Sequence, residues 1–439
     1  MSHVLLVGAG CTGALTAVFL RQEAARRGQE IQQLCVWEWG RGPAGRMSSF
    51  WVDVHGQRVL ADVGAQVISL RTLGRLPSWL AKHLIPAEPA GLAQTDERGE
   101  EWHHFFAPAG LAALQRASLE EAHPEELHFN RRLLELGAGS SRCWRAGYAS
   151  EKGGRRPAGF QEFDAVIFAG TAQDASNLEG FRTALAPVQL RALKSVTYDH
   201  RVCIALILQA DMSSHVERLC QGRAELSFAD AGPIALISRQ EVKGRTSREP
   251  ECPFAVVVHG TPAFAMRNLQ NAKSSGRPPS EIGKQALLEC LAHLLSMSSQ
   301  SLQSRVVDCK TVHWRQCQVR KAFPQIPQSL PCLIADAAPK LVLAGDYLAC
   351  KETAGSFEGC LDSAQATAHA MCCALFGEDD AASPVAPAAN VDEFHHGTSL
   401  GRSGRWRSAP ANTAEPASVS KNEQCKGSGR RWIHKTAKS

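Results

Sequence analysis

Near the start of the chain lies the stretch Val4-Leu5-Leu6-Val7-Gly8-Ala9-Gly10-Cys11-Thr12-Gly13, which runs directly into a second apolar segment at 14–20. This pattern predicts a buried strand, a G-x-G-x-x-G turn and a helix. Gly8 permits the turn, Gly10 lets the backbone approach a pyrophosphate, and Gly13 lets the helix lie close to the strand. The free N–H groups of the helix start favour phosphate oxygens. The stretch therefore predicts a Rossmann-like α/β fold that binds a dinucleotide.

The residues that follow supply the context that this motif requires. The first helix is expected to end near Arg26-Arg27-Gly28, and a second apolar strand, 34–37, runs into Glu38. A carboxylate at this strand end is placed to accept hydrogen bonds from both hydroxyls of an adenosine ribose. An ordinary glycine-rich surface turn would not require this arrangement. Glu38 is therefore the predicted ribose ligand.

Length and composition are those of a globular chain with two or three domains. The 439 residues are 44% hydrophobic, and no apolar run of 18 residues occurs, so we expect no transmembrane segment. The apolar start lacks a basic region and contains the phosphate turn, so we do not expect a signal peptide. Residues 401–439 carry nine Lys or Arg and two Asp or Glu, and the rest of the chain is nearly neutral. This distribution argues against nucleic-acid binding by the fold.

The fifteen cysteines favour thiols over disulfides. Their number is odd, no pair has C-x-x-C spacing, and most stand inside apolar runs. Buried reduced thiols are typical of a reducing compartment, which favours the cytoplasm. His103 and His104 are adjacent, and neighbouring residues of a strand point to opposite faces, so they make a poor chelating pair. We expect no metal site.

A loop with an arginine follows the second strand. Residues 42–47 contain Arg46, whose guanidinium is placed to donate two parallel hydrogen bonds to a phosphate. A solvated arginine in a turn is the alternative. The next segment, 60–68, carries small residues at a place where backbone could approach an isoalloxazine ring.

The later strands divide between two domains. The buried strand 163–171 is expected to rejoin the first sheet, whereas strand-like runs and a helix from Glu281 to Met297 indicate a second, mixed α+β domain. Those runs are 202–208, 234–237 and 254–259. The expected division is 1–75, 160–180 and 335–377 for the nucleotide-binding domain, and 76–159 and 181–334 for a substrate domain. Residues 378–439 lack a sustained apolar period, which predicts a disordered basic tail.

A second carboxylate at a strand end stands far along the chain. The buried strand 341–345 runs into Asp346, and a helix opens about ten residues later at 355–360. The aspartate is placed to accept from a ribityl hydroxyl, while the N–H groups of the helix start face the edge of a flavin. A nucleotide bound at one end only would not require this pair. The arrangement favours FAD over NAD.

Taken together, these motifs resemble the renalase family of the flavin-dependent amine-oxidase-like superfamily, in order over nearly all of residues 1–377. The resemblance implies an FAD cofactor, with flavin contacts at Thr12, Arg46, Gln66 and Val67 and with Asp346 as the ribityl carboxylate. Glu358, in the first turn of the last helix, is counted with the cofactor-binding residues. The segments that carry the resemblance are 7–13, 44–47, 61–66, Trp314-Arg315 with Gln318-Val319, Gly345-Asp346 and 357–360.

The resemblance also implies a reaction. Renalase-like enzymes oxidise the 2- and 6-dihydro isomers of NAD(P)H to NAD(P)+, with hydride passing to flavin N5 and O2 then giving H2O2. The sequence contains no evident acid–base dyad, and this chemistry needs none because the departing hydride restores the aromaticity of the ring. The catalytic residues and the oligomeric state stay unassigned. Secretion is also open by the same resemblance.

Two other functions stay open. Amine oxidases of the superfamily typically enclose the substrate nitrogen in an aromatic cage, and of Tyr148, Tyr198 and Tyr347 only Tyr347, beside Asp346, stands near such a place. A flavin-binding interaction module without catalysis is the third interpretation. It is suggested by the long loop between Asp346 and the last helix and by the basic tail.

Overall fold

The computed structural model describes residues 2–87, 101–140, 143–150, 154–228, 232–244, 252–324, 330–336 and 338–378. The predicted disordered tail lies outside these residues, apart from Glu378.

A six-stranded sheet carries the N-terminal motif. Its order is β20-β21-β12-β1-β2-β8, and all neighbouring strands are parallel except β20 and β21. The predicted strand 163–171 does rejoin this sheet, as β12 between β1 and β21, and it starts after Asp164. The mixed α/β fold with a Rossmann-like sheet is therefore confirmed. The strands are β1 (His3–Val7), β2 (Gln33–Trp37), β8 (Glu126–His128), β12 (Ala165–Phe168), β20 (Leu333–Ala335) and β21 (Ala338–Leu343).

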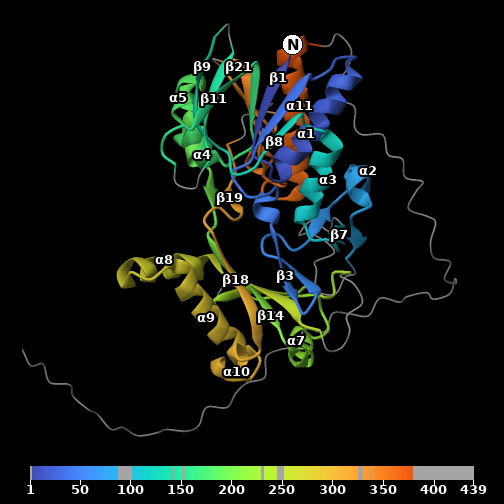
Figure 1. Ribbon diagram of the computed structural model, residues 1–439, viewed down its shortest axis with the longest axis vertical. Helices are drawn as coiled ribbons and strands as arrows, with labels where there is room; N and C mark the ends of the chain where they lie inside the picture. The colour runs from blue at the N-terminus through green and yellow to red at the C-terminus, as the bar shows by residue number, and fades with distance from the viewer. Residues whose placement is uncertain are drawn as a thin grey trace, which may run out of the picture. The chain divides into compact units, whose positions relative to one another are not determined.

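Both faces of the parallel sheet are buried, which is why its central strands are continuously apolar. Val4 and Leu6 pack among residues of α1 (Cys11–Arg26), α3 (Ala112–Ala122) and α11 (Phe357–Phe376). Leu5 and Val7 pack on the opposite side, and Figure 1 shows these two layers on either side of the sheet. The second layer consists of β9 (Arg132–Ala138), β10 (Trp144–Ala149), β11 (Gly159–Phe163), α4 (Ala172–Asn177), α5 (Glu179–Ala184) and α6 (Pro187–Ser195).

A second large sheet has five antiparallel strands in the order β15-β16-β17-β14-β18. Its strands are β14 (Arg201–Leu208), β15 (Glu225–Ser227), β16 (Ile234–Arg239), β17 (Phe254–Gly260) and β18 (Val306–Trp314). One face packs on helices and the other on the hairpin of β3 (Ser49–Val54) and β4 (Gln57–Asp62). The helices are α7 (Ser213–Cys220), α8 (Pro262–Ser275), α9 (Pro279–Leu294) and α10 (Ser299–Gln303).

Smaller elements complete the described chain. A three-stranded sheet contains β5 (Ile68–Leu70), β6 (Ile85–Pro86) and β7 (His103–Phe106). The short helix α2 (Ser78–Ala81) lies between β5 and β6 in the sequence. The two-stranded pair is β13 (Thr197–Tyr198) with β19 (Val319–Lys321). Four short 3-10 turns are η1 (Gly45–Met47), η2 (Leu73–Arg75), η3 (Ala210–Met212) and η4 (Asp346–Leu348).

One long helix, α8, was not predicted from the sequence, although its boundary signals are present. Thr261 caps its start by accepting from the Phe264 N–H at 3.2 Å, Pro262 stands at its first position, and Gly276 ends it at φ +69°. The expected helix from Glu281 to Met297 exists as α9, with both ends two or three residues earlier. The domain division stays a prediction, and β8, from the range given to the substrate domain, lies in the nucleotide-binding sheet.

Candidate functional site

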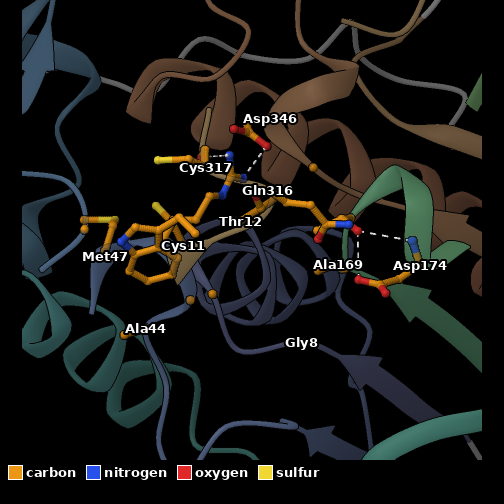
Figure 2. Close-up of a pocket in the computed structure, with 18 of the residues that line it drawn as sticks. Gly8, Cys11, Thr12, Ala44, Met47, Ala169, Asp174, Gln316, Cys317 and Asp346 are labelled. Atoms are coloured by element: carbon orange, nitrogen blue, oxygen red, sulfur yellow. Dashed lines mark hydrogen bonds and ion pairs between the residues drawn. The ribbon is translucent and has the colours of Figure 1, made fainter. Parts of the chain in front are cut away.

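A cavity of about 1210 Å³ opens at the carboxyl ends of β1, β2, β12 and β21. Ligands of open α/β sheets bind at this edge. Figure 2 shows the segments that converge there, with Gly8, Cys11 and Thr12 near Ala169, Cys317 and Asp346. The volume exceeds the roughly 300–1,000 Å³ usual for a site that holds one small ligand. The cavity therefore has room for a dinucleotide and a second molecule.

Eight of the ten predicted cofactor contacts line this cavity. They are Gly8, Gly10, Thr12, Glu38, Arg46, Gln66, Val67 and Asp346. Gly13 and Glu358 are not in its wall. A Cβ on Gly13 would lie 2.0 Å from the Gly8 carbonyl oxygen, so this glycine serves close packing of α1. Glu358 is buried, and its carboxylate accepts from the Arg71 N–H at 2.7 Å.

The glycine turn leaves space that the protein itself does not fill. Gly8 adopts φ +101°, a conformation that favours glycine, and it joins β1 to α1. A Cβ on Gly10 would meet no protein atom closer than the Gly45 Cα at 4.0 Å. The start of α1 at Gly10 has no side-chain cap. The open space at Gly10 and the free N–H groups of the uncapped helix start together fit a pyrophosphate.

Glu38 is fixed by backbone donors. Its carboxylate accepts from the Ala9 N–H at 2.7 Å and from the Gly40 N–H at 2.5 Å. The first contact joins the end of β2 to the glycine turn after β1. Each carboxylate oxygen keeps a further acceptor site for a ribose hydroxyl, because a carboxylate accepts about four hydrogen bonds.

Arg46 and Asp346 stand 300 positions apart and form an ion pair in the cavity wall. The Nη2–Oδ1 distance is 2.6 Å, and Arg46 Nη1 also donates to the Cys317 carbonyl at 3.3 Å. The Arg46 side chain is 34% exposed and that of Asp346 is 3% exposed. A guanidinium has five N–H donors, so Arg46 keeps donors for a phosphate or another oxygen in the cavity.

The loop 62–67 forms another part of the wall and is held tightly from behind. A Cβ on Gly64 would lie 1.8 Å from the Arg46 carbonyl oxygen, so only glycine permits this approach. Gln66 Nε2 donates to the carbonyls of Asp62 at 2.5 Å and of Gly64 at 2.9 Å. Its side chain is therefore used to fix the loop, while Gln66 and Val67 still line the cavity.

The opposite wall comes from the antiparallel sheet, and only part of it was predicted from the sequence. The lining residues are Arg201, Leu236, His259, His313, Trp314 and Arg315. Trp314 Nε1–H donates to the Val63 carbonyl at 2.9 Å, which links β18 to the loop 62–67. Of these residues, only Trp314 and Arg315 belong to a segment that carries the family resemblance. Arg201, His259 and His313 stand at or next to the ends of β14, β17 and β18. Their place at strand ends is the one feature of the sequence that could have identified them as site residues.

Two histidines of this wall are held neutral. Burial lowers the pKa of His259 to about 3, with Arg201 and Lys243 adding to the effect. Burial also lowers the pKa of His313, followed by Arg315 and His200. The His259 Nε2 lies 3.3 Å from the Gln66 Nε2, so this ring stands against the loop 62–67.

The His259 shift predicts a pH dependence of stability. Its ordinary pKa is 6.5, so between about pH 6.5 and pH 3 the unfolded histidine binds a proton that the folded one does not. As the pH is lowered through this window, the unfolding free energy of the parent chain should fall relative to that of His259→Gln. The expected loss is up to about 1.4 kcal/mol for each pH unit. Urea unfolding of both chains at pH 7, 6 and 5 measures the difference. A constant difference would contradict a buried neutral His259.

The described residues contain one group with metal-ligand spacing, Cys35, Glu126 and His128 at the β2–β8 edge. Glu126 Oε2 accepts from His128 at 2.9 Å and from Cys35 at 3.6 Å, so hydrogen bonds account for the group. His104 instead bonds to Ser69 at 2.8 Å.

Comparison with known proteins agrees with this geometry. Residues 83–372, more than half of the chain, match the family model described as flavin containing amine oxidoreductase. The chain is 25% identical over 383 residues to the renalase of Mus musculus. The aligned region covers 83% of this chain and 97% of that protein.

The fold also resembles a solved structure from Exiguobacterium sp. 255-15, described as a protoporphyrinogen oxidase. The TM-score is 0.55 at 11% identity, with 84% of this chain and 98% of that chain covered. At this identity the likeness concerns the fold alone. Across the residues that were described, no helix combines the length and apolar character needed to cross a membrane.

Proposed function

The chain belongs to the family of flavin-containing amine oxidoreductases and uses FAD, and from this premise we propose that it oxidises isomeric dihydronicotinamide dinucleotides with O2. The substrates are the 2- and 6-dihydro forms of NAD(P), and the products are NAD(P)+ and H2O2. When bound, the flavin supplies the two-electron acceptor for this chemistry. The predicted contacts that line the cavity, from Gly8 to Asp346, are proposed to hold it.

The charge of the cavity wall carries this proposal. Among the described lining residues are six arginines, 46, 131, 132, 155, 201 and 315, and three carboxylates, Glu38, Asp174 and Asp346. Each carboxylate already accepts a hydrogen bond from the protein, as Asp174 does from Thr171 Oγ1 at 2.8 Å. A positive wall attracts an anionic dinucleotide and disfavours a cationic amine.

The chain's own residues bind and orient the substrate. Arg201 and Arg315 lie on the wall formed by the antiparallel sheet and are proposed to take the phosphates of the substrate. His259 and His313 have lowered pKa values and are uncharged near pH 7, so they add no competing positive charge beside the nicotinamide. No side chain has to remove a proton, because hydride leaves a ring that becomes aromatic. Position and exclusion of water are what the protein supplies.

The geometry supports amine oxidation less well. Tyr148 packs edge-on against Trp37 with ring centroids 5.2 Å apart and is not in the cavity wall. Tyr347 is 1% exposed, and its ring covers Gly345, where a Cβ would lie 2.3 Å from a ring carbon. Tyr198 and Tyr347 both line the cavity, and the Tyr198 hydroxyl accepts from the Ala172 N–H at 3.1 Å. Both rings are buried, so they do not make an open, two-sided cage for an ammonium group.

Rapid mixing without oxygen tests the proposed substrate. The FAD-loaded chain should lose its visible flavin absorbance with 6-dihydroNAD and keep it with a catecholamine. Arg201→Met and Arg315→Met should each raise KM about tenfold or more, the value of a charge-assisted contact. Arg116→Met on α3, an exposed position outside the cavity, is the matched control.

The three interpretations give different outcomes. Bleaching by the amine alone would overturn the dihydronicotinamide proposal in favour of an amine oxidase. A yellow chain that neither substrate reduces would favour a flavin-binding module. Admitting air to the reduced chain should restore the absorbance and release one H2O2 per substrate, and failure to do so would exclude O2 as the acceptor.

A further inference from the structure

Lys243 is a buried lysine directly behind the cavity wall. It lies in the turn after β16, its side chain is 0% exposed, and it is not a lining residue. Lysine is almost never fully buried unless its ammonium is paired, because desolvation of the charge is costly. Its contacts should therefore show what its position stabilises.

The Lys243 ammonium is directed at Gln66. Its Nζ donates to the Gln66 carbonyl oxygen at 2.9 Å and to Gln66 Oε1 at 2.9 Å. Glu225 Oε1 lies 3.8 Å from Nζ, and the ring centroid of Phe106 lies 5.5 Å away. The two contacts at 2.9 Å therefore join Lys243 to one residue of the cavity loop.

The contact with the Gln66 carbonyl fixes the next N–H group. A trans peptide places its C=O and N–H on opposite sides, and the described chain has no cis peptide bonds. The Gln66 carbonyl faces Lys243, outside the wall, so the Val67 N–H of the same peptide faces away from Lys243. Val67 itself lines the cavity. No described residue accepts a hydrogen bond from this N–H.

From this geometry we propose that Lys243 is a positioning residue that orients and polarises the Gln66–Val67 peptide, so that the Val67 N–H donates to the acceptor edge of the bound flavin ring. The inference rests on the proposed site. A cation at the carbonyl end withdraws electron density from the peptide and makes its N–H a stronger donor. A donor to N1 or to the C2 carbonyl favours the reduced ring, whose negative charge lies at that edge, over the oxidised one. Lys243 therefore raises the reduction potential of the flavin.

Gln240 offers a matched comparison. It is 1% exposed, and its Nε2 donates to the same Gln66 Oε1 at 2.8 Å. It carries no charge and makes no contact with the Gln66 carbonyl in the described network. Gln240→Met and Lys243→Met therefore both remove one hydrogen bond to the Gln66 side chain, but only the second removes the cation and the contact that orients the peptide.

The test uses purified chains loaded with FAD and needs no substrate. The midpoint potential is measured by dye-coupled reduction for the parent chain, Lys243→Met, Lys243→Gln and Gln240→Met. Binding of FAD and of 1-deazaFAD, which has a carbon in place of the acceptor N1, is measured by fluorescence. The second lysine variant keeps a hydrogen-bond donor without the charge, so a result remains available if methionine impairs folding.

We expect both lysine variants to lower the midpoint potential. We also expect the preference for FAD over 1-deazaFAD to fall roughly three- to tenfold in Lys243→Met, the value of about one hydrogen bond. Gln240→Met should change neither quantity. Unchanged lysine variants, or an equal shift in Gln240→Met, would overturn the role of Lys243. A parent chain that binds no FAD would instead contradict the proposed site itself.

Discussion

A Gly10→Glu chain is expected to fold and to purify without colour. The added side chain projects where the protein leaves open space, since the nearest atom to a Cβ there is the Gly45 Cα at 4.0 Å. Its carboxylate would stand against the pyrophosphate proposed to bind the start of α1. Two like charges about 4 Å apart repel by about 4 kcal/mol at an effective dielectric of about 20. That loss corresponds to roughly a thousandfold weaker FAD binding.

The control for this experiment is Gly137→Glu. Gly137 lies in β9 with an open position around it, because no heavy atom stands within 4 Å of a Cβ there. Both substitutions add the same charge to a place that packing leaves free. Flavin content from the visible spectrum, together with the urea midpoint of the flavin-free chains, separates ligand loss from unfolding. A yellow Gly10→Glu protein would refute the phosphate assignment at α1.

The local part of the cavity could be predicted from the sequence because each signal is a short motif tied to a strand end. Gly8 and Gly10 follow β1, Glu38 follows β2, and Asp346 follows β21. Parallel strands bring their carboxyl ends to one edge, so a reader of the sequence can place these residues together without knowing the packing. Arg46 and Asp346 form an ion pair because both lie at that edge of the sheet. Neither residue alone indicates in the sequence that the other is its partner.

The opposite wall could not be predicted in this way. His259 and Arg201 reach the cavity because β14 pairs with both β17 and β18 in a particular register, which a single sequence does not reveal. Lys243 was missed for another reason. A lysine in a polar turn is expected at the surface, and only the fold shows that the Lys243 side chain is buried behind the loop 62–67.

This distribution of signals has a functional meaning. The predictable side, after the parallel strands, holds the residues proposed for a cofactor that many proteins share. The unpredictable side, on the antiparallel sheet, holds the residues proposed to choose the substrate. Trp314 joins the two sides through its contact with the Val63 carbonyl. Changes in β14, β17 or β18 are therefore expected to alter substrate preference while FAD is retained.

The ion pair of Arg46 and Asp346 should contribute strongly to FAD affinity, and its two members unequally. Removing Arg46 leaves Asp346 buried without its cation and also removes the donors proposed for the phosphate side of FAD. Truncating one partner of a desolvated charge pair costs about 2–5 kcal/mol. We use the lower half of that range because Arg46 is 34% exposed. Arg46→Met should thus weaken FAD binding roughly 30- to 300-fold.

Arg46→Lys should recover only part of this loss, because an ammonium cannot donate the two parallel hydrogen bonds of a guanidinium. Asp346→Asn keeps the shape and one acceptor oxygen, so about a tenfold loss is expected, close to one hydrogen bond. Titration of the flavin-free chains with FAD, alone and in the Arg46→Met/Asp346→Asn double variant, gives the coupling energy. Full FAD affinity in Arg46→Met would show that the ion pair is a structural contact that does not contribute to FAD binding. The phosphates would then be bound by the backbone at the start of α1, whose contribution Gly10→Glu measures independently.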